Sequence, residues 1–227
     1  MALVRRTTAA PAAPTSAPAD PAALAEALHD PDPERRRAAA VDLHGFAAAV
    51  PALLARVAVE DDAAARDAVL TSLAGHDTPA VAEALCAHLG SEDAGLRTAV
   101  VETLAAMPCG AVPLLPGLVA DPDPDVRILT AMILADLPAP DAELRLVELV
   151  SGDTHRNVVG AALAALLPMA TAAHAALLRR TRDRFADDPF LRFTIDAALP
   201  ALAAADEPCA ADAAAAAGDA GPAGGSR

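Results

Sequence analysis

The sequence lacks lysine, tryptophan, tyrosine and glutamine, and it contains a single asparagine, Asn157. Without lysine the chain can form neither a Schiff base nor the phosphate contact of a P-loop. Aromatic residues make up 2% of the chain, whereas hydrophobic residues as a whole make up 54%. A large core must therefore consist of Ala, Leu and Val, which favours close-packed helices over a β-sandwich.

Cysteine is also scarce. Cys86, Cys109 and Cys209 are widely spaced, and no CxxC or Cys/His spacing of a zinc site is present. We expect reduced thiols that pack as small residues or lie in a tail, in a cytoplasmic protein without a metal or other cofactor. No segment reaches the roughly 18 charge-free apolar residues of a membrane span.

Positive charge is in the minority. The 17 basic residues, all of them arginines, face 31 acidic residues, so the formal net charge is −14. Nucleic acids and anionic membrane surfaces attract basic proteins. The charge therefore argues against both kinds of partner and favours another protein or a peptide.

Large apolar residues are few at both ends of the sequence. Residues 1–19 are rich in Ala, Pro, Ser and Thr, and residues 205–227 consist mostly of Ala and Gly. Segments of this composition bury too little apolar surface to offset the entropy lost on ordering. We therefore expect two disordered tails around one folded domain at residues 20–204.

The phrases DPDPERR at 30–36 and DPDPDVR at 121–127 indicate an internal repeat. Aligning them places six arginines in register, at steps of 30, 31, 30, 29 and 36 residues. A small or β-branched residue follows each arginine three positions later, and a leucine follows seven positions later. The leucines are Leu43, Leu73, Leu104, Leu134, Leu163 and Leu199. Offsets of three and seven lie on one face of a helix, so each unit begins with an amphipathic helix.

Local signals mark where these helices begin. Asp32, Asp123 and Asp188 each precede a proline, and Asp20 and Thr78 do the same at two other expected starts. Asp or Thr caps the free amides, and proline at the first helical position has no amide to satisfy. A second apolar segment follows in the units, at 50–58, 80–89, 112–120, 142–150 and 173–180. Pro116 should kink or shorten the third of these segments.

Each unit is thus a helix–turn–helix of about 30 residues, and stacked units bury the apolar faces that one unit cannot bury alone. We predict an all-α fold, a right-handed α-solenoid of about six repeats. The stretches LHDPDPERRRAAAVDL and LVADPDPDVRILTAMILADL resemble HEAT repeats, in particular the short HEAT-like repeats of phycobilin lyases. The resemblance covers about residues 21–204 and is weakest at SGDTHRNVVGAALAAL.

The resemblance implies a structural role for the aligned arginines. In that family the repeated Asp and Arg residues form a ladder between neighbouring repeats, and a guanidinium can bond the carbonyls and carboxylates of the next unit. The ladder residues would be Arg36, Arg66, Arg97, Arg127, Arg156 and Arg192.

Catalytic signatures of enzymes built on such repeats are absent from the sequence. Deoxyhypusine hydroxylase binds iron through His-Glu pairs, but this chain has no His-Glu dipeptide and its six histidines do not recur at one repeat position. HEAT-like DNA glycosylases need a basic groove with aromatic residues, which the charge and composition oppose. No Gly-x-Ser-x-Gly elbow occurs either. We therefore expect a protein that is not an enzyme.

The expected function is that of a scaffold, adaptor or assembly factor, monomeric by itself, that binds a protein partner on the concave face of the solenoid. The second helices line that face and offer a mixed surface of Arg56, Glu83, His88, Glu143, Arg145 and Glu148. The alternative is a phycobilin-lyase-like subunit or a carrier of an open-chain tetrapyrrole.

The C-terminal part of the repeat region carries two further features. The stretch RRTRDR contains Arg179, Arg180, Arg182 and Arg184. These cations either complement the dipole at a helix end or form a patch for an acidic partner. Three of the four phenylalanines, Phe185, Phe190 and Phe193, also lie here. We expect them to close the last repeat as a cap, with an exposed binding surface as the alternative.

Overall fold

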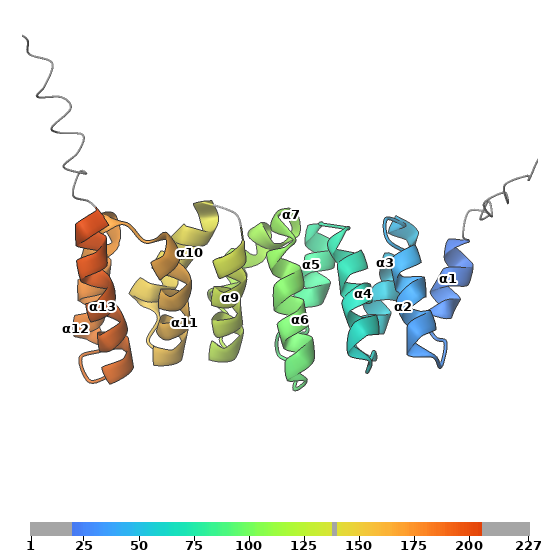
Figure 1. Cartoon of the computed structure of the whole chain (residues 1–227), viewed down its shortest axis with the longest axis horizontal. Helices are drawn as coiled ribbons and strands as arrows, with labels where there is room; N and C mark the ends of the chain where they lie inside the picture. The colour runs from blue at the N-terminus through green and yellow to red at the C-terminus, as the bar shows by residue number, and fades with distance from the viewer. Residues whose placement is uncertain (1–19, 138–139, 206–227) are drawn as a thin grey trace, which may run out of the picture. The chain divides into compact units, whose positions relative to one another are not determined.

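The structure, a computed structural model, describes residues 20–137 and 140–205 (Figure 1). The predicted tails, apart from Ala205, and Cys209 lie outside these residues. Within the described ranges every regular element is an α-helix or a short 3-10 helix, and no strand occurs. The predicted all-α repeat fold, an α-solenoid, is confirmed.

Residues 20–76 belong to a first compact unit. Helix α2 packs against α4, α3 packs against α4, and α1 packs against α2. The elements are α1 (Pro21–Ala27), α2 (Pro33–Asp42), η1 (Ala47–Ala49), α3 (Val50–Val57) and α4 (Ala63–Ala74). Two first helices, α2 and α4, thus lie side by side, with α3 as the second helix between them in sequence.

Residues from Asp77 onward belong to a second compact unit. Here α6 packs against α9, α9 against α11, α10 against α11 and α12, and α12 against α13. The α-helices are α5 (Pro79–Cys86), α6 (Ala94–Ala105), α7 (Pro108–Ala111), α8 (Leu115–Leu118), α9 (Pro124–Asp136), α10 (Pro140–Gly152), α11 (Arg156–Leu166), α12 (Ala175–Arg184) and α13 (Pro189–Ala205). The 3-10 helices are η2 (Val112–Leu114), η3 (Leu167–Met169) and η4 (Ala172–His174).

The predicted helix starts are confirmed. The carboxylate of Asp32 accepts a hydrogen bond from the Glu34 amide at 3.0 Å, and that of Asp188 accepts from the Phe190 amide at 3.0 Å. Asp20, Asp123 and Thr78 cap their helices in the same way. Asp62 and Asp93 also act as N-caps although no proline follows them. The side-chain oxygen at the N-cap is therefore the recurring signal, and the proline is an accessory to it.

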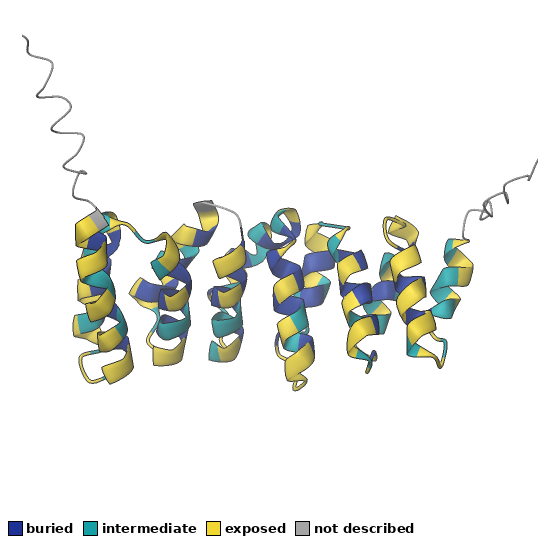
Figure 2. Ribbon diagram, viewed as in Figure 1, coloured by how far each residue is buried: buried dark blue, intermediate teal, exposed yellow. Residues whose placement is uncertain are grey.

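Buried residues occur in helices along the described part of the chain (Figure 2), and they include most of the predicted leucines. Leu43, Leu73, Leu104, Leu134 and Leu163 are fully buried, whereas Leu199 in the last helix is partly buried. The predicted break near Pro116 is also confirmed, because the segment after α6 consists of α7, η2 and α8. No single helix in the described ranges has the length and hydropathy of a membrane span, although α6 and the segment 108–118, bent by 96°, would pass together on length and composition alone.

Candidate functional site

The arginine Arg36 joins two consecutive repeats. Its side chain is 7% exposed, and its Nε and Nη2 atoms donate to the two carboxylate oxygens of Glu60 at 2.9 and 2.7 Å. Its Nη1 atom donates to the carbonyls of Asp30 and Pro31 at 3.0 and 3.1 Å. One guanidinium therefore holds the turn before α2 and the turn before α4 together.

Glu60 is the centre of this cluster. It also accepts hydrogen bonds from Arg56 Nε at 2.8 Å and from the Asp62 amide at 3.0 Å. Burial by itself would raise the pKa of Glu60, but the hydrogen bonds from the two arginines and the amide outweigh burial and lower that pKa well below its usual range. The sequence predicts Arg56 as part of the partner-binding surface. Its side chain is 13% exposed and bound to Glu60, so it offers no free surface cation.

Arg127 repeats this arrangement in the second unit. Its Nε atom donates to Asp153 at 2.6 Å, and its Nη1 atom donates to the carbonyl of Asp121 at 2.7 Å. Burial would raise the pKa of Asp153, but the hydrogen bond from Arg127 and the His155 amide lower it overall. Five of the aligned arginines donate to the carbonyl six residues earlier in the chain; they are Arg36, Arg66, Arg97, Arg127 and Arg192.

Arg156 differs from these five arginines. It is the first residue of α11, whereas each of the others is the fourth residue of its helix. It is exposed, and its side chain makes no hydrogen bond or ion pair with another residue in the described part of the chain. The fourth residue of α11 is Val159, which is fully buried. The predicted register of this repeat is thus shifted by three residues, and Arg156 lies outside the ladder geometry.

The other residues predicted to line the concave face lie on or next to two second helices, α5 and α10. Glu83 is exposed on α5, and His88 is half-buried in the turn after it. On α10, Arg145 donates to Glu148 at 2.8 Å, and Glu143 lies 3.1 Å from Nε2 of His174. Between these charges Leu144 is 58% exposed.

The four arginines of RRTRDR have different roles. Arg182 forms a two-pronged ion pair with Asp196, and Arg184 donates to the carbonyls of Val150 and Ser151 at the end of α10. The guanidinium of Arg184 also lies 4.8 Å from the centre of the Phe185 ring. Arg179 and Arg180 are exposed. A surface patch for an acidic partner would therefore depend on these two residues.

The predicted aromatic cap is only partly observed. Phe185 is half-buried against the core, but Phe190 and Phe193 are 68% and 73% exposed. The prediction that all three rings close the last repeat is therefore wrong. Buried positions on α13 are occupied by Leu191, Ile195 and Leu202 instead, which turns the second and fifth residues of that helix to solvent.

Two residues with clear structural roles were not predicted from the sequence. Glu60 and Asp153 are the carboxylates that Arg36 and Arg127 bind, 24 and 26 residues further along the chain. Glu60 stands six residues before Arg66, as Asp30 stands six residues before Arg36. Alignment of the turns as well as the arginines would have identified Glu60 as an acidic turn residue.

The thiols of Cys86 and Cys109 both have a raised pKa. Burial, followed by the charge of Glu83, raises the pKa of Cys86 to about 11. Cys109 is exposed, but its hydrogen bond with Asp77 raises the pKa of its thiol. The same carboxylate accepts from the amides of Cys109 and Gly110 at 3.0 and 2.6 Å. No group of three His, Cys, Asp or Glu residues that could hold a metal ion occurs within residues 20–137 and 140–205.

Replacing Asp77 with asparagine should make Cys109 more reactive. Asp77→Asn keeps an acceptor oxygen for one of the two α7 amides and removes the charge that disfavours the thiolate, so the thiol pKa should fall. At pH 8 the rate of alkylation by iodoacetamide should rise about tenfold for each unit of that fall. The measurement uses a Cys209→Ser background, with Cys86 as the slow internal reference. An unchanged rate at Cys109 would show that Asp77 does not control its ionisation.

Comparisons with known proteins address the repeats themselves. A family model described as HEAT repeats matches residues 21–105 and 111–198. No curated protein matches the chain. Two engineered proteins with crystal structures from the Northeast Structural Genomics Consortium show structural similarity. One is 18% identical, with a TM-score of 0.39, over 82% of this chain and 97% of its own. The other is 19% identical, with a TM-score of 0.36, over 80% of this chain and 98% of its own. Since the family match extends over more than half of the sequence, the chain belongs to the HEAT repeat family.

Proposed function

We propose that this protein is a non-enzymatic scaffold or adaptor that binds a partner protein on the face formed by its second helices. The observation that carries the proposal is the exposed Leu144 on α10. One side of this helix is buried through Ala142, Leu146 and Leu149, so the opposite side, with Leu144 and Glu148, faces solvent. Leu144 is 58% exposed and lies outside the core cluster that α10 joins through its buried residues.

Leu144 and its charged neighbours have the composition that is typical of a protein interface. Glu143, Arg145 and Glu148 surround it with charges of both signs, and α12, which packs against α10, exposes Arg179. Protein interfaces typically combine an apolar centre with a polar rim. The net charge of −14 disfavours self-association, which supports a monomer in the absence of the partner. Free thiols at Cys86 and Cys109 support a cytoplasmic location.

The proposal is tested by affinity purification of the full chain from its native organism, followed by mass spectrometry. A defined partner should be recovered with the wild type and lost with Leu144→Glu, and the purified partner should bind that variant at least about tenfold more weakly. Met132→Glu, at an exposed position on the first helix α9, is the matched control and should retain the partner. Equal binding by both variants, or turnover of a substrate by the purified protein, would contradict the proposal.

A further inference from the structure

The second and fifth residues of the first helices share one face of each helix. In five of the six first helices this pair is polar, small or of mixed character. The pairs are Glu34 and Arg37 in α2, Ala64 and Asp67 in α4, Gly95 and Thr98 in α6, Asp125 and Ile128 in α9, and Asn157 and Gly160 in α11. In α13 the pair is Phe190 and Phe193, which are 68% and 73% exposed. Helix α13 therefore carries phenylalanine side chains on the face where the other five first helices do not.

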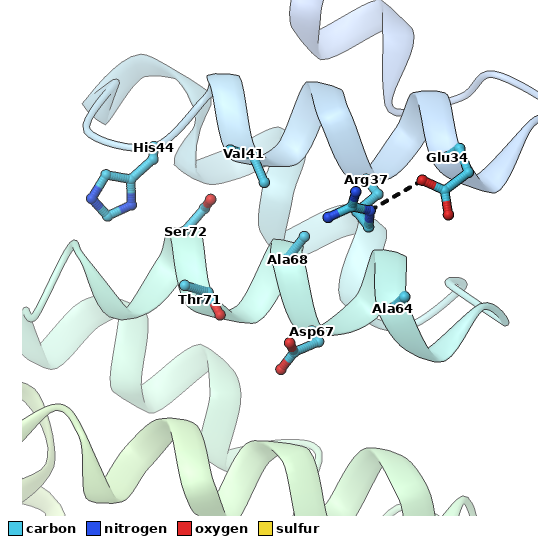
Figure 3. Close-up of a pocket in the computed structure, with 9 residues that line it drawn as sticks. All are labelled: Glu34, Arg37, Val41, His44, Ala64, Asp67, Ala68, Thr71 and Ser72. Atoms are coloured by element: carbon cyan, nitrogen blue, oxygen red, sulfur yellow. Dashed lines mark hydrogen bonds and ion pairs between the residues drawn. The ribbon is translucent and has the colours of Figure 1, made fainter.

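The groove between α2 and α4 shows the ordinary form of this face (Figure 3). It has a volume of about 500 Å³, and Val41 and Ala68 contribute its apolar lining. Its cation is already neutralised, because Arg37 Nε lies 3.2 Å from a carboxylate oxygen of Glu34. Polar side chains such as Asp67 line the rest of the groove. Its lining also includes His44, but it holds no arginine without an ion-pair partner and no phenylalanine ring.

The corresponding groove between α11 and α13 has a different character. Its volume is about 730 Å³, and its lining includes Arg156, Asn157, Gly160, Ala161, Phe190 and Leu191. A Cβ atom at Gly160 would lie 3.8 Å from Cε1 of Phe190 and 3.6 Å from Cδ2 of Leu191. The glycine thus leaves open the space beside the Phe190 ring. Large apolar surfaces that remain exposed in this way often mark interaction sites.

The charged residues of the α11–α13 groove also distinguish it from the groove between α2 and α4. Asp188 also lines it, but its Oδ1 atom accepts the amides of Phe190 and Leu191 at 3.0 Å and so caps α13. The side chain of Arg156 makes no hydrogen bond or ion pair with the residues that the structure describes, because α11 begins at this residue and the ladder position belongs to Val159. A chain with a net charge of −14 thus places an arginine without an ion-pair partner in the same groove as an exposed aromatic ring.

We propose that the α11–α13 groove is the docking site for a short segment of a partner protein that carries an aliphatic side chain next to an acidic residue. The aliphatic side chain packs beside Phe190 and over Gly160, and the carboxylate pairs with Arg156. This assignment rests on the proposed protein-binding function but adds a second surface, on the side of the first helices.

The available area determines the size of the occupant. A phenylalanine side chain can bury about 150–250 Å², so Phe190 and Phe193 together expose roughly 300 Å² of apolar surface. A stable complex usually buries about 800 Å² on each partner. Even with Phe193, which lies outside the groove, the exposed apolar surface is therefore too small for a stable interface with a second copy of this acidic chain, and it suits a short peptide segment.

The test begins with random twelve-residue peptides displayed on phage. They are selected on the full chain after removal of those that bind a Phe190→Ser variant. Synthetic versions of the selected peptides are then measured by fluorescence anisotropy. We expect peptides with an aliphatic residue near Asp or Glu, and binding at least about tenfold weaker for Phe190→Ser and for Arg156→Glu. A peptide with Arg in place of its acidic residue should regain affinity for Arg156→Glu. Both substitutions are at exposed positions, and circular dichroism checks that each variant is folded.

Leu144→Glu separates the two binding surfaces. It should leave peptide binding unchanged, because Leu144 lies on the second helix α10. Unchanged binding by Arg156→Glu, or selection of peptides without an acidic residue, would overturn the groove assignment while leaving the second-helix surface untouched. Sedimentation that showed self-association of the wild type but not of Phe190→Ser would assign the groove to a second copy and would also overturn it.

Discussion

Replacing Glu60 with alanine should lower the free energy of unfolding by about 3–5 kcal/mol, the range found when one partner of a buried ion pair is removed. The substitution leaves the guanidinium groups of Arg36 and Arg56, which are 7% and 13% exposed, without their shared carboxylate. It also removes the acceptor of the Asp62 amide. Urea denaturation followed by circular dichroism measures the loss. Glu60→Gln keeps an acceptor but no charge, so its loss should be smaller.

Asp61 provides the matched control. Its carboxylate lies 3.3 Å from Nη2 of Arg36, the same atom that Glu60 binds, but its side chain is 91% exposed. An exposed ion pair contributes little to stability because water screens it. Asp61→Ala should therefore change the unfolding midpoint far less than Glu60→Ala does. Equal losses for the two variants would show that burial of Glu60 is not the source of its contribution.

Replacing Glu60 with glutamine should alter how the stability of the protein responds to acid. The pKa of Glu60 is lower in the folded protein than the value of about 4.3 expected in the unfolded chain. Its contribution is therefore fully present above that unfolded value and is lost progressively as the pH falls toward the folded pKa. Between pH 6 and pH 3 the wild type should lose more stability than Glu60→Gln. Parallel curves would contradict this assignment. Asp153, whose pKa is also lowered, accounts for part of the slope that remains.

The sequence was sufficient for the fold class but not for the register of every repeat. The apolar stripe tolerates a shift of three residues, because positions three and four apart lie on the same helical face. Val159 and Leu163 are both fully buried. They therefore fit the predicted core positions even though the alignment on Arg156 is shifted by three residues from the true helix start. The cap distinguishes the two alignments. His155 precedes α11 without a side-chain capping bond, whereas Asp precedes the other aligned helices.

The buried charge cluster could not be predicted from spacing alone. Glu60, Asp61 and Asp62 are consecutive acidic residues with three separate roles: an internal ion pair, an exposed contact and a helix cap. The direction in which each side chain points depends on how the turn packs against a repeat that begins about 25 residues earlier. The exposed phenylalanines, in contrast, had a local signal. Once Leu191 and Ile195 are assigned to the core, helical periodicity turns Phe190 and Phe193 outward.

Replacing Leu134 with alanine should lower the free energy of unfolding by about 2–5 kcal/mol, the usual cost of truncating a buried leucine. Leu134 is fully buried, and it belongs to a cluster formed by residues of α9, α10 and α11, among others. The loss combines the apolar surface returned to water with the cavity left between packed helices. Leu104, equally buried seven residues after Arg97, should behave in the same way. Urea denaturation again supplies the measurement.

Met132 is the control on the same helix. Two residues along an α-helix correspond to a rotation of about 200°, so Leu134 and Met132 point to nearly opposite sides of α9. Met132 is 45% exposed, and Met132→Ala removes a side chain of similar size from a position with little surrounding core. Its effect should be a minor fraction of the effect at Leu134. A neutral Leu134→Ala combined with a costly Met132→Ala would mean that α9 presents the opposite face to its neighbours, and the leucine seven residues after each arginine would then not mark the core.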